Sequence, residues 1–267
     1  MISDITIGQY YKGDSFVHRL DPRMKIILTI IFIIMIFMCK NFLSLGLMIL
    51  FVFISIIASG VPFKMFFKSL KPIVPIVIFT ALLNMLYISD DKILLSFWIF
   101  NITEKGIYTA VFMAIRIICL IMRSSILTYT TVPTMLTDAL EKLLSPLNVF
   151  HISVHSLAMM MTLALRFIPT LIEEIERIMN AQKARGADFE TGSLMDRAKA
   201  LIPILVPLFI SAFRRADELA IAMECRCYQG GEGRTKLKQL HYTRLDFTAY
   251  GFGAVLILSI WLLSMVG

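Results

Sequence analysis

Residues 24–59 read MKIILTIIFIIMIFMCKNFLSLGLMILFVFISIIAS, an almost continuous apolar run that carries only two charged side chains, Lys25 and Lys40. A hydrocarbon core about 30 Å thick is crossed by roughly 17–25 helical residues, so the run is long enough for two spans. The connection between them lies at Lys40 and Asn41. It is so short that two crossing segments must form an antiparallel helical hairpin. The competing interpretation is a single buried hairpin.

The composition of the whole chain also indicates a membrane protein. Of its 267 residues, 58% are hydrophobic and 17% are charged, which is more apolar and less charged than ordinary soluble domains. The predicted spans lie near 24–41, 42–59, 72–88, 106–131 and 247–266. We therefore expect an all-α integral membrane protein with about five transmembrane helices.

The distribution of positive charge predicts the orientation of these spans. The loop at 89–105 has no positive excess, because its two lysines are outnumbered by three acidic residues. Basic residues instead precede the first span and separate the second from the third: Lys12, Arg19, Arg23, Lys25, Lys64, Lys68 and Lys71. Because cytoplasmic loops are enriched in lysine and arginine, the N-terminus is expected in the cytoplasm. The net charge of +7 thus indicates orientation in a bilayer and not nucleic-acid binding.

Residues 132–245 combine helical periodicity with many charges, which distinguishes them from the five spans. The chain is therefore predicted to have three parts. These are an N-terminal membrane domain of about four spans at 1–131, a cytoplasmic domain of long amphipathic helices at 132–245, and a transmembrane helix at 246–267.

Two long helices are predicted in the cytoplasmic part, at about 153–184 and 193–227, because apolar residues recur there at three- and four-residue spacing. Pro203 and Pro207 lie in the first half of the second helix. Proline removes a backbone donor and clashes with the preceding turn, so we expect a bend or an interruption there.

Each long helix ends on an arginine, Arg185 in the first and Arg226 in the second. Gly186 follows Arg185 and is a natural helix terminator, since glycine adopts the left-handed conformation without a steric penalty. The helix dipole favours a cation at this end, and the five fixed donors of a guanidinium can clamp a carboxylate of another protein. Two similar ends suggest two docking sites. A helix-terminal charge facing water is the alternative for either arginine alone.

Arg116 and Arg123 lie seven residues apart on one face of the fourth predicted span. A rise of roughly 15 Å from Gly106 places Arg116 near the middle of the bilayer. Charges at such depth are costly and mark a functional site or an internal pair. A functional role stays open for both. The alternative for Arg116 is a pair within the protein, and the alternative for Arg123 is a side chain that extends to the cytoplasmic surface. Neither is expected to bind substrate.

No metal, cofactor or catalytic group is expected in this chain. His151 and His155 share a helical face but lack further ligands, and Cys225 and Cys227 form an equally incomplete set. The glycine-rich run at 230–233 follows a helix and lacks the Gly-Lys-Ser/Thr ending of a phosphate loop. The five spans contain no Asp or Glu, which argues against an ion-coupled transporter.

Several motifs resemble the T components of energy-coupling factor (ECF) transporters. The opening resembles the family at Gly8, Tyr10, Ser15, His18, Arg19, Leu20, Asp21, Pro22, Arg23 and Lys25. The entry to the charged helices, Thr130-Thr131-Val132-Pro133, is also similar. Ala184-Arg185-Gly186 and Glu224-Cys225-Arg226-Cys227-Tyr228 resemble the paired Ala-Arg-Gly motifs of the family, although cysteines flank the second arginine. The resemblance covers nearly the whole chain.

The resemblance implies a non-catalytic coupling subunit of an importer for a vitamin or another micronutrient. Two homologous ATPase subunits, which themselves bind ATP and Mg, would dock at Ala184, Arg185 and Gly186 and at Cys225, Arg226 and Cys227. A small substrate-binding membrane protein, the S component, would be the third partner. The complex would lie in a prokaryotic plasma membrane, with the N-terminus and the coupling helices cytoplasmic. The alternative is a permease subunit of a conventional ATP-driven importer, which would present one coupling helix between spans.

Overall fold

The computed structural model describes residues 10–87, 93–97, 100–150, 153–187, 189, 193–230 and 240–266. Its internal contacts divide the described chain into two compact units. The membrane unit comprises 10–139 and 240–266, and the rod unit comprises 140–230. This division rests on contacts within the chain, so the predicted cytoplasmic placement of 132–245 stays a prediction.

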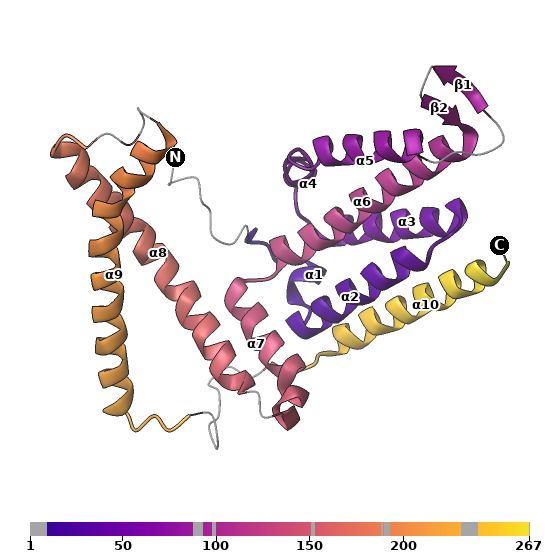
Figure 1. The fold of residues 1–267 in the computed structure, drawn as a ribbon. Helices are drawn as coiled ribbons and strands as arrows, with labels where there is room; N and C mark the ends of the chain where they lie inside the picture. Colours follow the sequence, from indigo (N-terminus) through magenta and orange to yellow (C-terminus); the bar gives the residue numbers. More distant parts are fainter. Residues whose placement is uncertain are drawn as a thin grey trace. The chain divides into compact units, whose positions relative to one another are not determined.

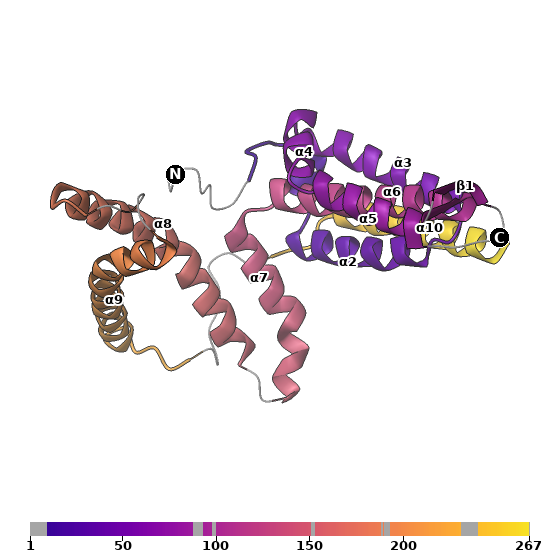
Figure 2. The same cartoon turned by 45° about the horizontal axis from the view of Figure 1, so that its top comes forward.

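The membrane unit is built from helices with one short hairpin (Figure 1). Its elements are α1 (Phe16–Arg19), α2 (Pro22–Met38), α3 (Phe42–Ser59), α4 (Phe63–Leu70), α5 (Val74–Tyr87), β1 (Ile93–Phe97), β2 (Phe100–Thr103), α6 (Glu104–Thr130), the first turns of α7 (Pro133–Leu144), and α10 (Arg244–Val266). The all-α fold class is confirmed. Figures 1 and 2 show α2, α3, α5, α6 and α10 running roughly alongside one another.

Local capping explains where several of these helices begin and end. Asp21 caps α2 by accepting the backbone N–H of Arg23, and Pro22 occupies the first turn, where its missing N–H costs no hydrogen bond. Gly60 ends α3 in the left-handed conformation at φ +64°. Thr103 accepts the N–H of Gly106 and thereby caps α6. These caps fix the lengths of the helices around α6.

The core of the membrane unit lies where α6 packs against α2, α3 and α4, and Val17 of α1 and Ile260 of α10 also belong to it. The largest fully buried side chains include Phe32, Ile36, Met48 and Phe66. On the other side of α2, Gly253 of α10 leaves room for a neighbouring leucine, since a Cβ there would lie 2.7 Å from the Leu28 Cδ2 atom. The core therefore holds the first and last helices of the chain in one unit.

The predicted spans are matched in two cases and modified in a third. Among the described residues, α3 and α6 are long and apolar enough to cross a membrane. The predicted span at 72–88 corresponds to α5, but α4 precedes it and forms a bent pair with it at an angle of 57°. Pro72 and Pro75 stand at the junction, where the missing N–H groups break the helical ladder. The predicted third span thus corresponds to a bent helix pair, which has the form of a broken span or a re-entrant loop.

The predicted loop between α5 and α6 contains a β-hairpin. β1 and β2 pair antiparallel, with Ser96 opposite Asn101 and Phe97 opposite Phe100. The register shifts between Ile93 and Leu95. A hairpin of nine described residues adds no second fold class, because it only closes the turn between two helices.

The rod unit consists of the end of α7, the 3-10 helix η2 (Ser145–Phe150), α8 (Val154–Ala184) and α9 (Leu194–Glu224). Ser193 and Asp196 form a capping box at the start of α9. Pro203 and Pro207 lie inside this helix without ending it, so the helix is not interrupted there, and the alternative of a bend stays a prediction. Each proline removes one donor, whereas the hydrogen bonds of the flanking turns remain and hold the 31-residue helix together.

α8 also qualifies as a membrane span by length and composition. Only 6% of its most apolar 18 residues are buried inside the chain, compared with 44% for α3. A surface of this kind requires lipid or another protein to cover it.

Candidate functional site

The C-terminal end of α8 is a Schellman motif with Arg185 at the C-cap. The N–H of Gly186 donates to the Lys183 carbonyl at 3.0 Å, and the N–H of Ala187 donates to the Gln182 carbonyl at 3.0 Å. Gly186 has a φ of +89°, which makes it the left-handed residue of the motif. The glycine stop predicted from the sequence is therefore present.

The C-terminal end of α9 repeats the same hydrogen-bond pattern. The N–H of Cys227 donates to the Glu224 carbonyl at 2.8 Å, and the N–H of Tyr228 donates to the Met223 carbonyl at 3.0 Å. Cys227 has a φ of +53° and is the one non-glycine residue with positive φ in the described part of the chain. Arg226 thus precedes a left-handed residue just as Arg185 does, and the flanking cysteines do not change the turn.

The predicted docking residues are all exposed: Ala184, Arg185, Gly186, Cys225, Arg226 and Cys227. Across the described residues, neither guanidinium has a hydrogen bond or an ion pair within the chain. The donors of Arg185 and Arg226 are therefore available to another molecule.

The two arginine ends lie at opposite ends of an antiparallel helix pair within the rod unit (Figure 1). Arg215 of α9 donates to Glu174 of α8 at 2.8 Å where the helices meet. Each of these two residues stands eleven positions before the terminal arginine of its own helix. At 1.5 Å per residue, each arm extends about 16 Å beyond this ion pair. The two ends are thus equivalent and well separated.

Arg116 has partners inside the membrane unit. Its Nη2 atom donates to the Cys39 carbonyl at 2.8 Å, and its guanidinium lies 4.8 Å from the centroid of the Phe112 ring. Cys39 is the C-cap of α2, where helix carbonyls lack intrahelical donors. This contact connects the middle of α6 to the end of α2.

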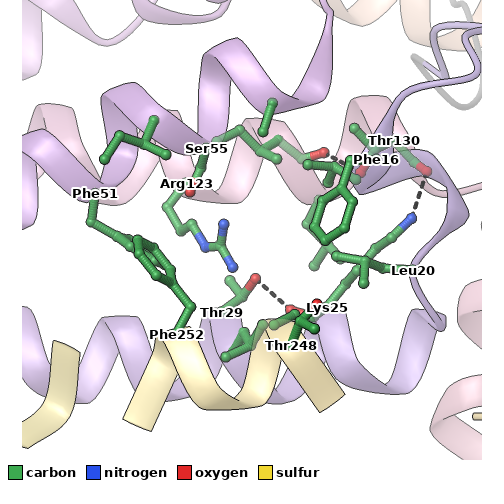
Figure 3. Close-up of a pocket in the computed structure, with 17 residues that line it drawn as sticks. Phe16, Leu20, Lys25, Thr29, Phe51, Ser55, Arg123, Thr130, Thr248 and Phe252 are labelled. Carbon is green, nitrogen blue, oxygen red and sulfur yellow. Dashed lines mark hydrogen bonds between the residues drawn. The ribbon is translucent and has the colours of Figure 1, made fainter. Parts of the chain in front are cut away.

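Arg123 differs from Arg116, although it lies two turns further along the same helix. Its side chain points into a cavity of about 260 Å³ within the membrane unit (Figure 3). The residue is 7% exposed, and its guanidinium lies 5.3 Å from the centroid of the Phe51 ring. Its Nε atom is buried, and no hydrogen-bond acceptor in the described chain contacts it.

The N-terminal motif residues form a buried polar frame that the sequence analysis did not anticipate. Lys25 donates to the carbonyls of Thr130 at 2.9 Å and His18 at 3.3 Å, and to the Thr131 hydroxyl at 3.3 Å. The N–H of Tyr11 donates to the Tyr129 carbonyl at 2.9 Å. The opening motif and the Thr130-Thr131 motif are therefore in direct contact. The presence of both motifs in one sequence is the signal that could have pointed to this contact.

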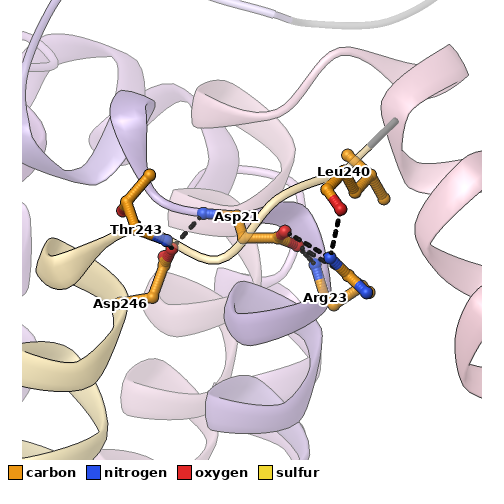
Figure 4. A network of polar contacts seen from close by, with 5 residues as sticks. All are labelled: Asp21, Arg23, Leu240, Thr243 and Asp246. Atoms are coloured by element: carbon orange, nitrogen blue, oxygen red, sulfur yellow. Dashed lines mark hydrogen bonds and ion pairs between the residues drawn. The ribbon is translucent and has the colours of Figure 1, made fainter. Parts of the chain in front are cut away.

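Asp246 is the most buried acid of this frame and was missed entirely (Figure 4). One of its carboxylate oxygens accepts the N–H of Asp21 at 2.8 Å, and the other accepts the N–H and hydroxyl of Thr243 at 2.7 and 2.8 Å. Arg23 in turn pairs with Asp21 at 2.9 Å and donates to the Leu240 carbonyl. The sequence Thr-x-x-Asp before an apolar run is a capping-box pattern, which could have pointed to this residue.

No group of three or more His, Cys, Asp or Glu residues that could hold a metal is found in the described ranges. His155 contacts Glu141, with 2.9 Å between its Nδ1 atom and the carboxylate oxygen. His151 lies outside the described residues. Cys225 and Cys227, the second incomplete ligand set, are free thiols.

Comparison with known proteins agrees with the motifs. Residues 13–237 match the family model described as CbiQ, cobalt transport protein. The energy-coupling factor transporter transmembrane protein EcfT of Ruminiclostridium cellulolyticum is 51% identical over 266 residues, covering 100% of this chain and 99% of its own length. The EcfT proteins of Clostridium kluyveri and Bacillus subtilis are 50% and 46% identical, and cover 100% and 92% of this chain and 98% and 93% of their own lengths. The chain therefore belongs to the family of energy-coupling factor transporter transmembrane proteins.

Proposed function

We propose that this chain is the coupling subunit of an ATP-driven importer and that it docks one ATPase at each arginine-bearing helix end. The observation that carries the proposal is the equivalence of the two ends. Arg185 and Arg226 occupy the same position of the same hydrogen-bonded motif, and both are exposed and unpaired within the described chain. A solvent-facing charge on one helix would not require a second copy of this arrangement.

The separation of the ends suits two partners of similar structure. Each ATPase would present a carboxylate to one guanidinium, which binds it through charge-assisted hydrogen bonds. ATP and Mg would be bound by these partners, and hydrolysis would take place there. Movement of the ATPases toward each other would then turn α8 against α9 about the contact between Glu174 and Arg215.

The exposed apolar faces of α8 and α9, the two rods of the rod unit, fit a small substrate-binding membrane protein. Met160 and Met161 on α8 and Phe209 and Phe213 on α9 are all exposed. A hydrophobic S component lying along these faces would cover them and would be reoriented as the rods turn. Its cargo would be a vitamin or another micronutrient. The assembly would lie in a prokaryotic plasma membrane as a multi-pass complex, with the N-terminus and the rods on the cytoplasmic side.

Charge reversal at the helix ends tests the docking assignment. Arg185→Glu and Arg226→Glu are each expected to release one ATPase, and the double variant should release both, because a carboxylate would then face a carboxylate. Loss of a buried charge pair at an interface costs about 2–5 kcal/mol, which weakens binding by more than 10-fold. The readout is the amount of each ATPase that copurifies with the tagged chain.

Arg177→Glu and Arg214→Glu supply the matched control. Both arginines are exposed on the same two helices, away from the ends. Each of these substitutions changes the net charge by the same amount as a charge reversal at Arg185 or Arg226. Because neither residue lies at a helix end, full copurification of both ATPases is expected. Unchanged assembly and transport in the Arg185→Glu, Arg226→Glu double variant would refute the docking assignment.

A further inference from the structure

The cavity of the membrane unit is a mostly apolar chamber with two cationic side chains in its lining. It is lined by residues of α1, α2, α3, α6 and α10, mostly aliphatic and aromatic (Figure 3). Its polar side chains are Lys25, Thr29, Ser55, Arg123, Thr130 and Thr248. Among the residues that the structure describes, no acidic side chain belongs to the lining. Arg123 therefore faces an internal space whose described lining offers it no counter-charge, whereas Lys25 has Asp21 and Asp246 nearby, outside the lining.

Arg123 is the cation with unused donors. Lys25 uses the three donors of its ammonium on His18, Thr130 and Thr131. Arg123 has no hydrogen bond to any residue of the described chain, although it is only 7% exposed. A buried charge without a partner is strongly unfavourable, and arginine stays protonated in proteins. This site is therefore incomplete without an anion.

The surroundings indicate an anion that is attached to hydrocarbon. Phe51, Leu28 and Leu127 line the interior of the cavity. At its margin, Ile54 of α3 and Phe252 of α10 are 42% and 48% exposed, so the apolar lining continues onto the outer surface of the unit. A free inorganic anion would leave this apolar surface uncovered. A molecule with a charged head and apolar chains would cover it.

The depth of Arg123 fits the headgroup region of a bilayer. Arg123 stands seven residues before Thr130, the last residue of α6, which is a distance of about 10 Å along the helix. Long basic side chains near helix ends reach toward the membrane interface. We propose that the cavity binds the headgroup of an anionic phospholipid, with its phosphate on the Arg123 guanidinium and its acyl chains along Ile54 and Phe252.

The donors in the cavity fit a phosphate. A guanidinium binds two phosphate oxygens through parallel hydrogen bonds. The hydroxyls of Thr29 and Thr248 already donate to backbone carbonyls, whereas Ser55 has no hydrogen bond within the described chain and can donate to a third oxygen. The volume of about 260 Å³ is below the 300–1,000 Å³ typical of sites that enclose a drug-sized ligand. It therefore holds a headgroup and leaves the chains outside.

Native mass spectrometry of the delipidated full chain in detergent tests the proposal. Phosphatidylglycerol is titrated in parallel with phosphatidylcholine and with inorganic phosphate. The wild type is expected to bind one phosphatidylglycerol at least about 10-fold more tightly than phosphatidylcholine, since only the former carries a net negative charge. Arg123→Met should abolish this preference, and Arg123→Lys should retain part of it.

Arg116→Met is the control, because Arg116 is also a buried arginine of α6 but uses its Nη2 donor on Cys39 and does not line the cavity. It should leave the lipid preference unchanged. Ser55→Phe, which fills the cavity without removing the charge, should weaken phosphatidylglycerol binding and so provides evidence if Arg123→Met fails to fold. Equal binding of the two lipids, or a preference that survives Arg123→Met, would overturn the proposal. Competition by millimolar inorganic phosphate would assign the site to a free anion, and an acidic partner residue crosslinked at this cavity would assign it to a protein.

Discussion

The carboxylate of Asp246 accepts the backbone N–H of Asp21 at 2.8 Å, across 225 positions of sequence. This hydrogen bond joins the first turn of α10 to the start of α2, and Asp246 is completely buried. The last helix is therefore held by the same polar frame that caps the first long helix.

Replacing this carboxylate should destabilise the membrane unit. Asp246→Ala leaves the N–H groups of Asp21 and Thr243 without their acceptor. An unsatisfied buried donor costs about 1–3 kcal/mol, so we expect a loss of about 2–4 kcal/mol in the free energy of unfolding. Thermal unfolding in detergent measures this loss as a lower Tm.

Asp14→Ala is the control for Asp246→Ala, because Asp14 pairs with Arg19 at the exposed surface. The hydrogen bond and the positive charge of Arg19 lower the pKa of the Asp14 carboxyl. Whatever the pair contributes is present at neutral pH and is lost as the pH falls through this lowered pKa. Asp14→Ala should leave the Tm near that of the wild type. A comparable loss in both variants would contradict the role given to Asp246.

Lys25 is expected to be essential for the contact between the N-terminal motif and the end of α6. Lys25→Met preserves most of the side-chain volume but removes the hydrogen bonds to Thr130, Thr131 and His18. Hydrogen bonds to a charged group contribute about 1.5–3 kcal/mol, so a loss of about that size is expected in chemical denaturation. Lys12→Met, at an exposed position, should have no measurable effect.

The ion pair between Glu174 and Arg215 should couple α8 to α9. Glu174→Arg places two arginines together and should weaken the packing of the rods, whereas adding Arg215→Glu restores an opposite pair. For a partly exposed pair, the coupling in a double-mutant cycle should be about 0.2–1 kcal/mol. Transport by the assembled complex should fall in Glu174→Arg and recover in the charge swap.

Arg214→Glu controls for a general effect of charge on α9, because Arg214 is exposed beside Arg215. Transport should not recover when Glu174→Arg is combined with Arg214→Glu. If this second pair recovers equally, the specific contact between Glu174 and Arg215 is not what couples the rods.

Cys227 and Cys225 should respond to glycine in opposite directions. Cys227→Gly relieves the left-handed conformation, which costs a non-glycine residue about 1–2 kcal/mol, so the end of α9 should become more stable. Cys225 has helical angles, with φ −61° and ψ −22°, and glycine there loses roughly 0.5–1 kcal/mol. Hydrogen exchange of the Cys227 and Tyr228 amides measures both effects.

Slower exchange in Cys227→Gly and faster exchange in Cys225→Gly is the expected pair of results. Cys227→Val should make the exchange of these amides faster than in the wild type, since a β-branched residue is least compatible with positive φ. Equal effects of glycine at the two positions would show that the turn does not depend on the left-handed residue.

Features set by neighbouring residues could be predicted from the sequence. The Asp21-Pro22 cap, the glycine stop at Gly186 and the two arginine ends all follow from a few adjacent positions, and the apolar runs identify α3 and α6. The end of α9 at Cys227 was harder, because cysteine has no preference for positive φ. Its left-handed turn becomes visible only in the backbone.

Features that depend on distant contacts could not be predicted in the same way. Asp246 meets Asp21 only after the intervening chain has folded, and no spacing relates the two positions. The roles of Arg116 and Arg123 look identical in sequence, yet one meets the Cys39 carbonyl and the other faces a cavity. In α9 a local signal alone does not decide the structure, because the helix continues through Pro203 and Pro207.

Among the described residues, the rod unit is an insertion in the membrane unit, because 10–139 and 240–266 both belong to the latter. It is therefore connected to the membrane unit at two points of the chain, one within α7 and one before Leu240. The second connection enters the membrane unit at Leu240, and close to it Asp246 accepts hydrogen bonds from the backbone N–H groups of Asp21 and Thr243, which hold the start of the last helix against the start of the first long one.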